Sequence, residues 1–442
     1  MPANTLEDIY PFFHGQSMRP DEFESLYVDA DRGRGVPIFQ RLNRRLVLMP
    51  EGSQKMLFAG HRGCGKSTEL LRLKRELDSD FSVLHFSILN ELDPQNLSYI
   101  ELFIATMEQL FLFFQRESGV HLPDRYFSII QTWMTSREIQ EINQDYMSMD
   151  VETGLKAGLN IPFLAEFFAK FRAAAKSSTS LKEVLRSKVE PKLSDLILNC
   201  NLLIDYIRSQ LPRIGKKGLV IIIEDLDKVE MKRAEDIFYA HSAQLTQLAC
   251  PIVFTFPIAL LYHPRFKAIE NNYEQVLVLP MVMVRQRNGD PFPDGMEVME
   301  QVIAHRMDLG LFEDRSILQE MIVMTGGHFW DLFRMVTESS DHALDSGRQR
   351  IGRADYLAAY NALKANYERT LSENIEKGFS VDTYLETLVS CARDPQKKPK
   401  VSEVMLDLMN NQAVLHYDGE NWHDVHPLVK DILKDRGLLE NG

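Results

Sequence analysis

Continuous apolar runs of strand length are the most regular feature of the chain. One lies at 56–59 before a glycine-rich stretch, a second runs from Leu219 to Ile223, and a third, "CPIVFTFPI", covers 250–258. Runs of this length, bounded by glycine or acidic residues, are typical of parallel strands that helices cover on both faces. The pattern therefore predicts an α/β fold with a parallel sheet.

Helical periodicity dominates the rest of the chain. Residues 67–77 have the spacing of an amphipathic helix, and the apolar segment 99–114 predicts a buried helix. A long amphipathic helix is expected over 180–211, interrupted where Pro191 can break it. The segment 154–178 also has an apolar face, which predicts core packing or a coiled extension; docking on a partner or a membrane surface is the alternative.

The glycine-rich stretch "GHRGCGKS", Gly60 to Ser67, matches the phosphate-binding pattern G-x-x-x-x-G-K-[ST]. Its glycines let backbone N–H groups converge on phosphate oxygens, and the helix that follows points its N-terminus at them. Lys66 is expected to contact the β- and γ-phosphates, and Ser67 to bind Mg²⁺. The predicted nucleotide-binding residues are Gly60, His61, Arg62, Gly63, Cys64, Gly65, Lys66, Ser67 and Thr68.

An acidic group follows the second apolar strand, in "GLVIIIEDLDKVE". Ligands of open α/β sheets bind at the carboxyl ends of the strands, so these acids belong beside the phosphate loop. Glu224 is predicted to hold Mg²⁺ through water, Asp225 to orient or deprotonate the attacking water, and Asp227 to support either. Most such segments place aspartate before glutamate, whereas this chain has Glu224 before Asp225. We expect the reversed order to slow ATP hydrolysis more than it weakens ATP binding.

Two residues of the predicted site also have a plainer interpretation. Thr255, the polar residue of the third strand, could contact the γ-phosphate side or could simply suit a strand. Cys64 in the loop could be a small residue that fits, or a thiol whose oxidation blocks ATP binding.

With these strands in order, the chain resembles the AAA+ and STAND group of P-loop ATPases. It looks closest to the origin-recognition-like branch and to bacterial ATPases that carry a "GHRGCGKSTEL" loop. The segments that carry the resemblance are the phosphate loop, "EDLD" after the second strand, "FTFPIALLY" (254–262), "LVLPMVMV" (277–284) and "TGGHFWDLFRMV" (325–336). It implies ATP rather than GTP, a helical lid and an oligomer in which a neighbour supplies an arginine, with Arg265 and Arg233 as candidates. Related lids often carry a sensor arginine where this chain has Trp330; Arg334, one turn later, is the candidate substitute.

The resemblance also suggests how the chain divides. We expect a lead-in over 1–50 beside the nucleotide site, an ATPase core over 51–285, a helical lid over 286–350 and a winged-helix-like domain over 351–442. A helical insertion at about 96–210 explains why Lys66 and Glu224 lie 158 positions apart. In the last unit, two short strands are expected around Asp418-Gly419, a strong hairpin signal.

Charge argues against general attraction to nucleic acid, because the formal net charge is −13. Residues 353–442 carry 11 basic and 15 acidic side chains, so the last domain is expected to contact protein rather than DNA. Four basic residues of the lead-in are expected on a solvated face, with a phosphate or a neighbouring subunit as the alternative contact: Arg32, Arg34, Arg44 and Arg45.

Cysteine spacing and hydropathy indicate in which cellular compartment the protein is expected. The four cysteines are widely spaced and suggest neither a disulfide nor a zinc framework, and His416, His423 and His426 lack the spacing of metal ligands. The first residues show no signal peptide, and both long apolar segments are shorter than the roughly 20 residues of a membrane span. A cytoplasmic protein is expected.

These observations predict an ATP-driven switch with slow, partner-dependent hydrolysis. It would form homo-oligomers and act on a separate effector or client protein, since no effector domain is evident; the resemblance implies bacterial signalling or antiviral defence. Two alternatives stay open: a DNA-associated ATPase, such as a loader or transposition regulator, and a nucleotide-held scaffold without turnover.

Overall fold

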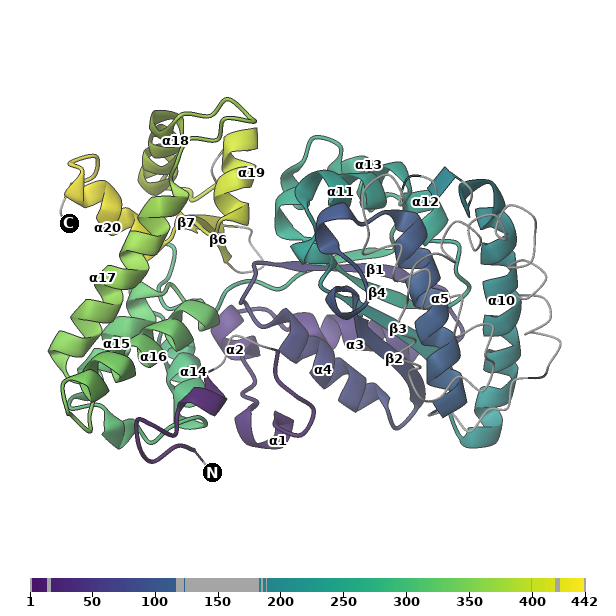
Figure 1. Ribbon diagram of the computed structural model, residues 1–442, viewed down its shortest axis with the longest axis horizontal. Helices are drawn as coiled ribbons and strands as arrows, with labels where there is room; N and C mark the ends of the chain where they lie inside the picture. Colours follow the sequence, from purple (N-terminus) through teal and green to yellow (C-terminus); the bar gives the residue numbers. More distant parts are fainter. Residues whose placement is uncertain are drawn as a thin grey trace, which may run out of the picture.

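The computed structural model describes residues 2–13, 17–116, 189–398, 400–417 and 422–440, together with 123, 183, 186 and 187. The predictions for 154–178, for most of the insertion and for the Asp418-Gly419 turn lie outside the described residues. Two lobes lie side by side, an α/β core and a mostly helical lobe formed by the C-terminal part of the chain (Figure 1).

The core contains a parallel sheet in the order β2-β3-β4-β1-β5. Its strands are β1 (Lys55–Gly60), β2 (Phe81–Ser87), β3 (Gly218–Glu224), β4 (Ile252–Pro257) and β5 (Gln275–Val278). The predicted α/β class, with a phosphate loop after its first strand, is confirmed. β2 was not predicted, because the polar residues Ser82, His85 and Ser87 interrupt its apolar pattern.

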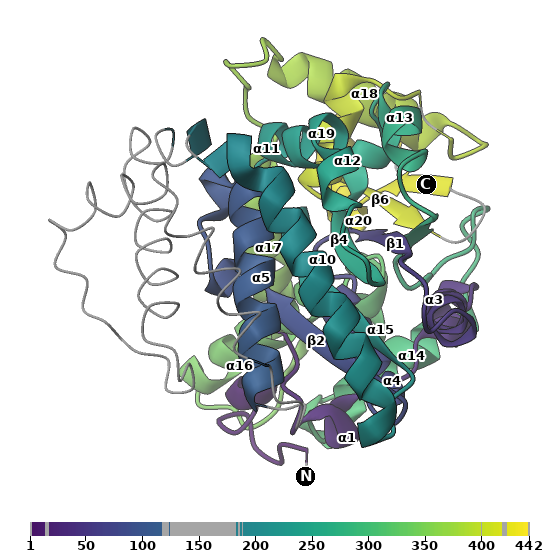
Figure 2. The ribbon, with the colours of Figure 1, turned by 90° about the vertical axis from the view of Figure 1, so that its right-hand side faces the viewer.

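Helices cover both faces of the sheet, as the fully buried strands require. On one face Leu219, Ile221 and Ile223 pack against α5 (Tyr99–Arg116) and α10 (Leu193–Gln210). On the other, Val220 and Ile222 pack against α3 (Ile38–Leu48) and α4 (Lys66–Leu77). Figure 2 shows α5 and α10 in front of the strands. Short helices complete the core and its approach: α1 (Phe23–Leu26), α2 (Asp31–Arg34), α11 (Met231–Glu235), α12 (Ser242–Leu245) and α13 (Phe266–Glu270).

The second lobe follows the predicted order of helices and hairpin. Its elements are α14 (Pro293–Ala304), α15 (Arg315–Met324), α16 (Phe329–Asp345), α17 (Arg353–Thr370), α18 (Val381–Arg393), α19 (Glu403–Asn410), β6 (Val414–Tyr417), β7 (Trp422–Val425) and α20 (Pro427–Asp435). Within the described ranges, no helix combines the length and the apolar character needed to cross a membrane.

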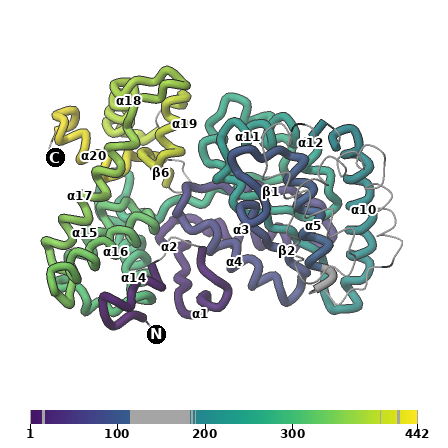
Figure 3. The backbone as a smooth tube through the Cα atoms, in the orientation of Figure 1, coloured from purple at the N-terminus to yellow at the C-terminus, as the bar shows by residue number. Residues whose placement is uncertain are grey.

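The lead-in does not stay beside the nucleotide site along its whole length. Ala3, Leu6, Ile9 and Phe13 are buried in the core of the second lobe, and Figure 3 shows the chain starting there before it crosses to the α/β core. The expectation for this segment was therefore wrong for its first residues. Only the later part, including α2, reaches the phosphate loop.

The β6–β7 hairpin joins the two lobes. Its antiparallel register pairs His416 with His423, and Tyr417 and Trp422 pack into the same apolar cluster as Met281 of the α/β core. The backbone N–H of Met281 donates to the carbonyl of His416 at 3.0 Å. The hairpin is thus anchored on the core and not only on its own helices.

Candidate nucleotide-binding site

The phosphate loop connects the end of β1 to the start of α4. Gly63 and Gly65 have φ angles of 74° and 99°, in the left-handed region that glycine adopts without the steric cost of a Cβ atom. No side chain caps α4, a helix of 12 residues, so its first N–H groups are left for a ligand. This arrangement is suited to binding phosphate oxygens.

Lys66, the first residue of α4, is buried and turned inward. Its Nζ atom donates to the carbonyls of Gly60 and His61, each at 2.8 Å, and forms an ion pair with Asp227 Oδ2 at 2.9 Å. Burial disfavours both charges, but the opposite charge outweighs it, so the pKa of Lys66 is raised and that of Asp227 is lowered. From the sequence, we expected Asp227 only to support Glu224 or Asp225.

The other two acids are held by β2. Glu224 Oε1 lies 2.6 Å from His85 Nε2, while Asp225 accepts from the hydroxyl of Ser87 and pairs with Lys228 at 2.7 Å. Asp225 has φ 70°, unusual for a residue with a side chain and a sign that the turn after β3 is tightly constrained. The three carboxylates, Asp227 included, therefore share no partner. His85 and Ser87 are site residues that the sequence pattern did not indicate.

Thr255 ties two strands together. Its buried Oγ1 accepts from the backbone N–H of Leu226 at 2.9 Å, which fixes the turn after β3 against β4. This contact fits the plainer interpretation; a contact to the γ-phosphate side stays a prediction.

Residues from outside the α/β core form hydrogen bonds with His61 and Arg62 of the phosphate loop. The carbonyl of Arg62 accepts from His328 Nε2 at 2.8 Å and from Gln412 Nε2 at 2.9 Å. The Nε2 atom of His61 accepts from the backbone N–H of His416 at 2.9 Å. Three residues of the second lobe, His328, Gln412 and His416, thus contact the loop directly.

Arg34 corrects the expectation of a solvated basic face. It is 1% exposed, and its guanidinium donates to the carbonyl of Pro280 and, at 2.7 Å, to that of Cys64 in the loop. Arg32 is exposed, as expected, and pairs with Glu297. Nothing in "DRGRG" distinguishes the two arginines, because the difference depends on tertiary contacts.

His328 belongs to a buried cluster of polar side chains centred on Asp331. Asp331 Oδ2 lies 3.0 Å from His328 Nδ1 and 3.2 Å from His426 Nε2, and accepts from the Tyr367 hydroxyl at 2.6 Å. Although burial alone would have the opposite effects, the attraction between Asp331 and His328 lowers the pKa of the carboxyl and raises that of the imidazole. The cluster orients His328 toward the loop and connects α16 to α17 and α20.

The predicted sensor position lies at the phosphate loop. A Cβ atom placed on Gly63 would lie 2.9 Å from the Cβ of Trp330 and 2.4 Å from His328 Nε2, so the start of α16 touches the loop. Arg334 is exposed on the same helix, and its charge acts on Tyr367. No contact of the described residues joins Arg334 to the loop, and its sensor role stays a prediction.

Cys64 is 1% exposed, with Sγ 3.8 Å from the carbonyl of Leu279. A buried thiol favours the interpretation of a small residue that fits over that of an oxidation sensor.

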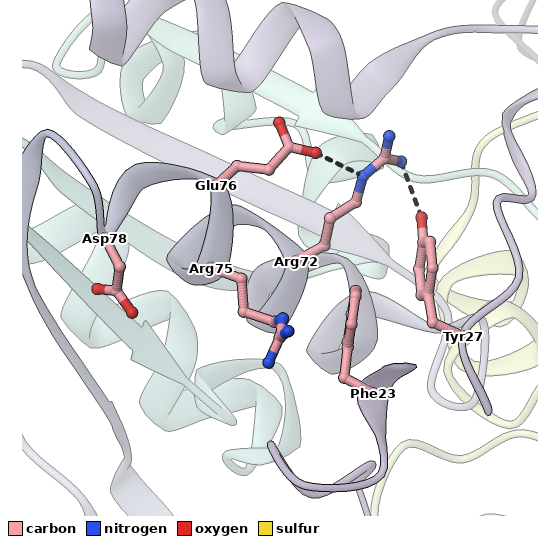
Figure 4. A pocket seen from close by; sticks show the side chains of 6 residues that line it. All are labelled: Phe23, Tyr27, Arg72, Arg75, Glu76 and Asp78. Carbon is pink, nitrogen blue, oxygen red and sulfur yellow. Dashed lines mark hydrogen bonds and ion pairs between the residues drawn. The ribbon is translucent and has the colours of Figure 1, made fainter. Parts of the chain in front are cut away.

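A surface hollow lies beside the second half of α4, away from the phosphate loop (Figure 4). Its arginines already have partners: Arg72 donates to Glu76 and Tyr27, and Arg75 lies over the ring of Phe23. We assign no ligand to it.

The residues present fit a nucleoside triphosphate with Mg²⁺. The unpaired N–H groups at the start of α4, the ammonium of Lys66 and the half-buried Ser67 and Thr68 supply donors for phosphate. Carboxylate and hydroxyl oxygens near the loop are the ligand type that Mg²⁺ prefers.

Among known proteins, only solved structures are similar to this chain. No protein-family model matches the chain, and no curated protein matches it significantly. Similar solved structures include Cdc6p from Pyrobaculum aerophilum, with 11% identity, 95% of this chain and 99% of that chain covered, and a TM-score of 0.41. The Aeropyrum pernix ORC2 protein (ADPNP-ADP complexes) has 12% sequence identity, with 97% of this chain and 99% of that chain covered and a TM-score of 0.42. The ORC1 protein of the same organism, in complex with DNA, has 12% identity, with 98% of this chain and 97% of that chain covered and a TM-score of 0.39. These are members of the origin-recognition group that the sequence motifs resemble; the likeness is distant, and what those proteins bind is not carried over to this chain.

Proposed function

We propose that the chain is an ATP-binding switch whose nucleotide state sets how its C-terminal unit docks on the α/β core. The unit is taken as residues 351–442, a winged-helix-like domain, with the core at 51–285 and the lid at 286–350. ATP would bind between the core and the lid, where the phosphate loop and the start of α16 meet.

The observation that supports this proposal is the set of hydrogen bonds that the second lobe makes with His61 and Arg62 of the phosphate loop. Gln412 and His416 of the C-terminal unit, and His328 of the lid, bond to His61 or Arg62. Phosphate binding to the N–H groups of this loop, residues 60–67, would restrain the same segment of backbone. A change in loop conformation therefore changes the geometry of contacts that hold the C-terminal unit.

The roles of the site residues follow the chemistry of phosphoryl transfer. Lys66 and the N–H groups of 60–68 would bind phosphate oxygens, and Ser67 and Glu224 would hold Mg²⁺, which supplies charge neutralisation when bound. Asp225 would orient the attacking water, and Thr255 and Arg334 would contact the γ-phosphate side.

Hydrolysis is expected to be slow. Asp225 is engaged by Ser87 and Lys228, so it is not free to act on a water in this conformation. The same observation favours a second candidate function, a nucleotide-held scaffold without turnover. An arginine from a neighbouring subunit could complete the site; Arg265 is 57% exposed and held by Glu235, and Arg233 is a second candidate.

Partners are proposed from charge and surface. On α19, the helix that would have to approach DNA, Glu403 is exposed, Asp407 is paired with Lys377, and no residue is basic. We therefore favour a protein effector or client, in signalling or antiviral defence, over a DNA-associated ATPase. Salt-sensitive DNA binding by the purified chain would reverse this preference.

Nucleotide binding and turnover test the proposal together. Binding of a fluorescent ATP analogue and phosphate release are measured for the wild type and for Lys66→Ala, with Lys74→Ala on the same helix as the matched control. We expect Lys66→Ala to lose binding and Lys74→Ala to keep it, with turnover that rises with protein concentration. Absence of binding in the wild type contradicts the switch; tight binding without turnover at any concentration leaves the scaffold.

A further inference from the structure

The ammonium of Lys66 has all its donors in use. It carries three N–H groups, and its acceptors are the carbonyls of Gly60 and His61 and the carboxylate of Asp227. The two carbonyls belong to the loop that would surround the phosphate. Asp227 is the one acceptor that comes from another element and carries a charge.

The ion pair is enclosed on both sides. The Lys66 and Asp227 side chains are 7% and 5% exposed, and their charged atoms are 2.9 Å apart. Taking one partner from such a pair leaves an uncompensated buried charge, which is strongly destabilising. Because all three N–H groups of Lys66 are in use, a phosphate oxygen that binds it must displace one acceptor or share its N–H group. Asp227 is the acceptor whose charge the phosphate repels, so it is the one we expect to be displaced.

We propose that Asp227 is an internal substitute for the nucleotide phosphate, and that it makes nucleotide binding depend on a divalent cation. This inference rests on the proposed nucleotide-binding function. Once displaced from Lys66, the carboxylate faces phosphate oxygens of like charge. Lys228, the other basic residue whose charge acts on Asp227, already pairs with Asp225 at 2.7 Å. A cation that enters with the nucleotide relieves this repulsion.

Glu224 is the matched control. It is as deeply buried as Asp227, but it lies against His85 and not against Lys66. Neutralising Glu224 removes a predicted metal ligand without freeing the lysine, whereas neutralising Asp227 frees the lysine. The two substitutions therefore separate metal binding from release of the ion pair.

The test measures binding of a fluorescent ADP analogue to the full chain, in Mg²⁺ and in EDTA, for the wild type, Asp227→Asn and Glu224→Gln. We expect the wild type to bind about tenfold or more tightly with Mg²⁺ than without it. Asp227→Asn should gain about tenfold in EDTA and lose most of its preference for Mg²⁺. Glu224→Gln should weaken binding in Mg²⁺ and should gain clearly less than Asp227→Asn in EDTA, because it leaves the Lys66–Asp227 ion pair in place.

Unchanged or weaker binding of Asp227→Asn in EDTA overturns the proposal. Thermal unfolding of each variant is recorded first, and Asp227→Ser, which is also neutral and smaller, takes the same test if the asparagine variant does not fold. Equal affinity of the wild type in Mg²⁺ and in EDTA also overturns the proposal, whatever the variants do. If the wild type binds no nucleotide in either condition, the proposed function itself is wrong.

Discussion

The Nε2 atom of His61 accepts a hydrogen bond from the backbone N–H of His416, 2.9 Å away and 355 positions later in the sequence. One residue lies in the phosphate loop and the other in the β6–β7 hairpin. Because Nε2 is the acceptor, the imidazole is neutral; burial favours this state by holding the pKa of His61 well below its usual value. The bond is a direct physical link between the nucleotide loop and the C-terminal unit.

Replacing His61 should loosen the hairpin. His61→Ala leaves the buried N–H of His416 without its acceptor, which costs about 1–3 kcal/mol in the free energy of unfolding. Denaturant unfolding should show this loss, and hydrogen exchange should rise over 414–417. His61→Gln, which can offer an amide oxygen, should recover part of the protection; equal exchange in the wild type and His61→Ala would argue against the link.

Arg34 should matter far more than its neighbour Arg32. Arg34→Ala leaves the carbonyls of Cys64 and Pro280 without donors, and we expect a loss of about 2–4 kcal/mol in unfolding free energy with weaker nucleotide binding. Arg32→Ala removes an exposed ion pair to Glu297 and should change stability by less than about 0.5 kcal/mol. Similar effects of the two substitutions would show that Arg34 does not support the loop.

Acidification should destabilise the hairpin through His423. Burial lowers the pKa of this histidine from 6.5 to about 3, and its Nε2 lies 2.9 Å from the hydroxyl of Tyr262 in the core. Between these pH values the unfolded chain binds a proton that the folded chain does not, so stability falls as the pH falls. The slope attributable to this residue is about 1.4 kcal/mol per pH unit, and His423→Gln should remove it. An unchanged slope in that variant would mean that other groups dominate.

Glu69 should have the opposite effect over part of the same range. Burial raises the pKa of its carboxyl from 4.5 to about 7. As the pH falls from 7 to 4.5 the folded chain binds a proton that the unfolded chain does not, so this group's contribution to stability rises. Glu69→Gln removes the cost of burying the charge and should stabilise the fold at pH 8 by about 3 kcal/mol, with little effect at pH 4.5. Equal unfolding free energies at pH 8 would contradict this account of Glu69.

Local patterns predicted the parts of the fold that local chemistry determines. The phosphate loop, the apolar strands β1, β3 and β4, and the helices α5, α10 and α17 were all readable from runs and periodicity. β2 escaped because three polar residues interrupt it, although two of them, His85 and Ser87, hold Glu224 and Asp225. Contacts such as that between Asp227 and Lys66 join distant segments, and one sequence carries no periodic signal for them.

Hydrogen exchange of the β6 segment tests the central claim most directly. Exchange over 414–417 is followed with and without Mg-ATP, in the wild type and in Lys66→Ala, after nucleotide binding to the wild type has been verified. Because the His416 amide is bonded to the phosphate loop, we predict a change in its protection on nucleotide binding in the wild type and none in Lys66→Ala. Identical exchange with and without bound nucleotide would contradict a switch that acts through the docking of the C-terminal unit.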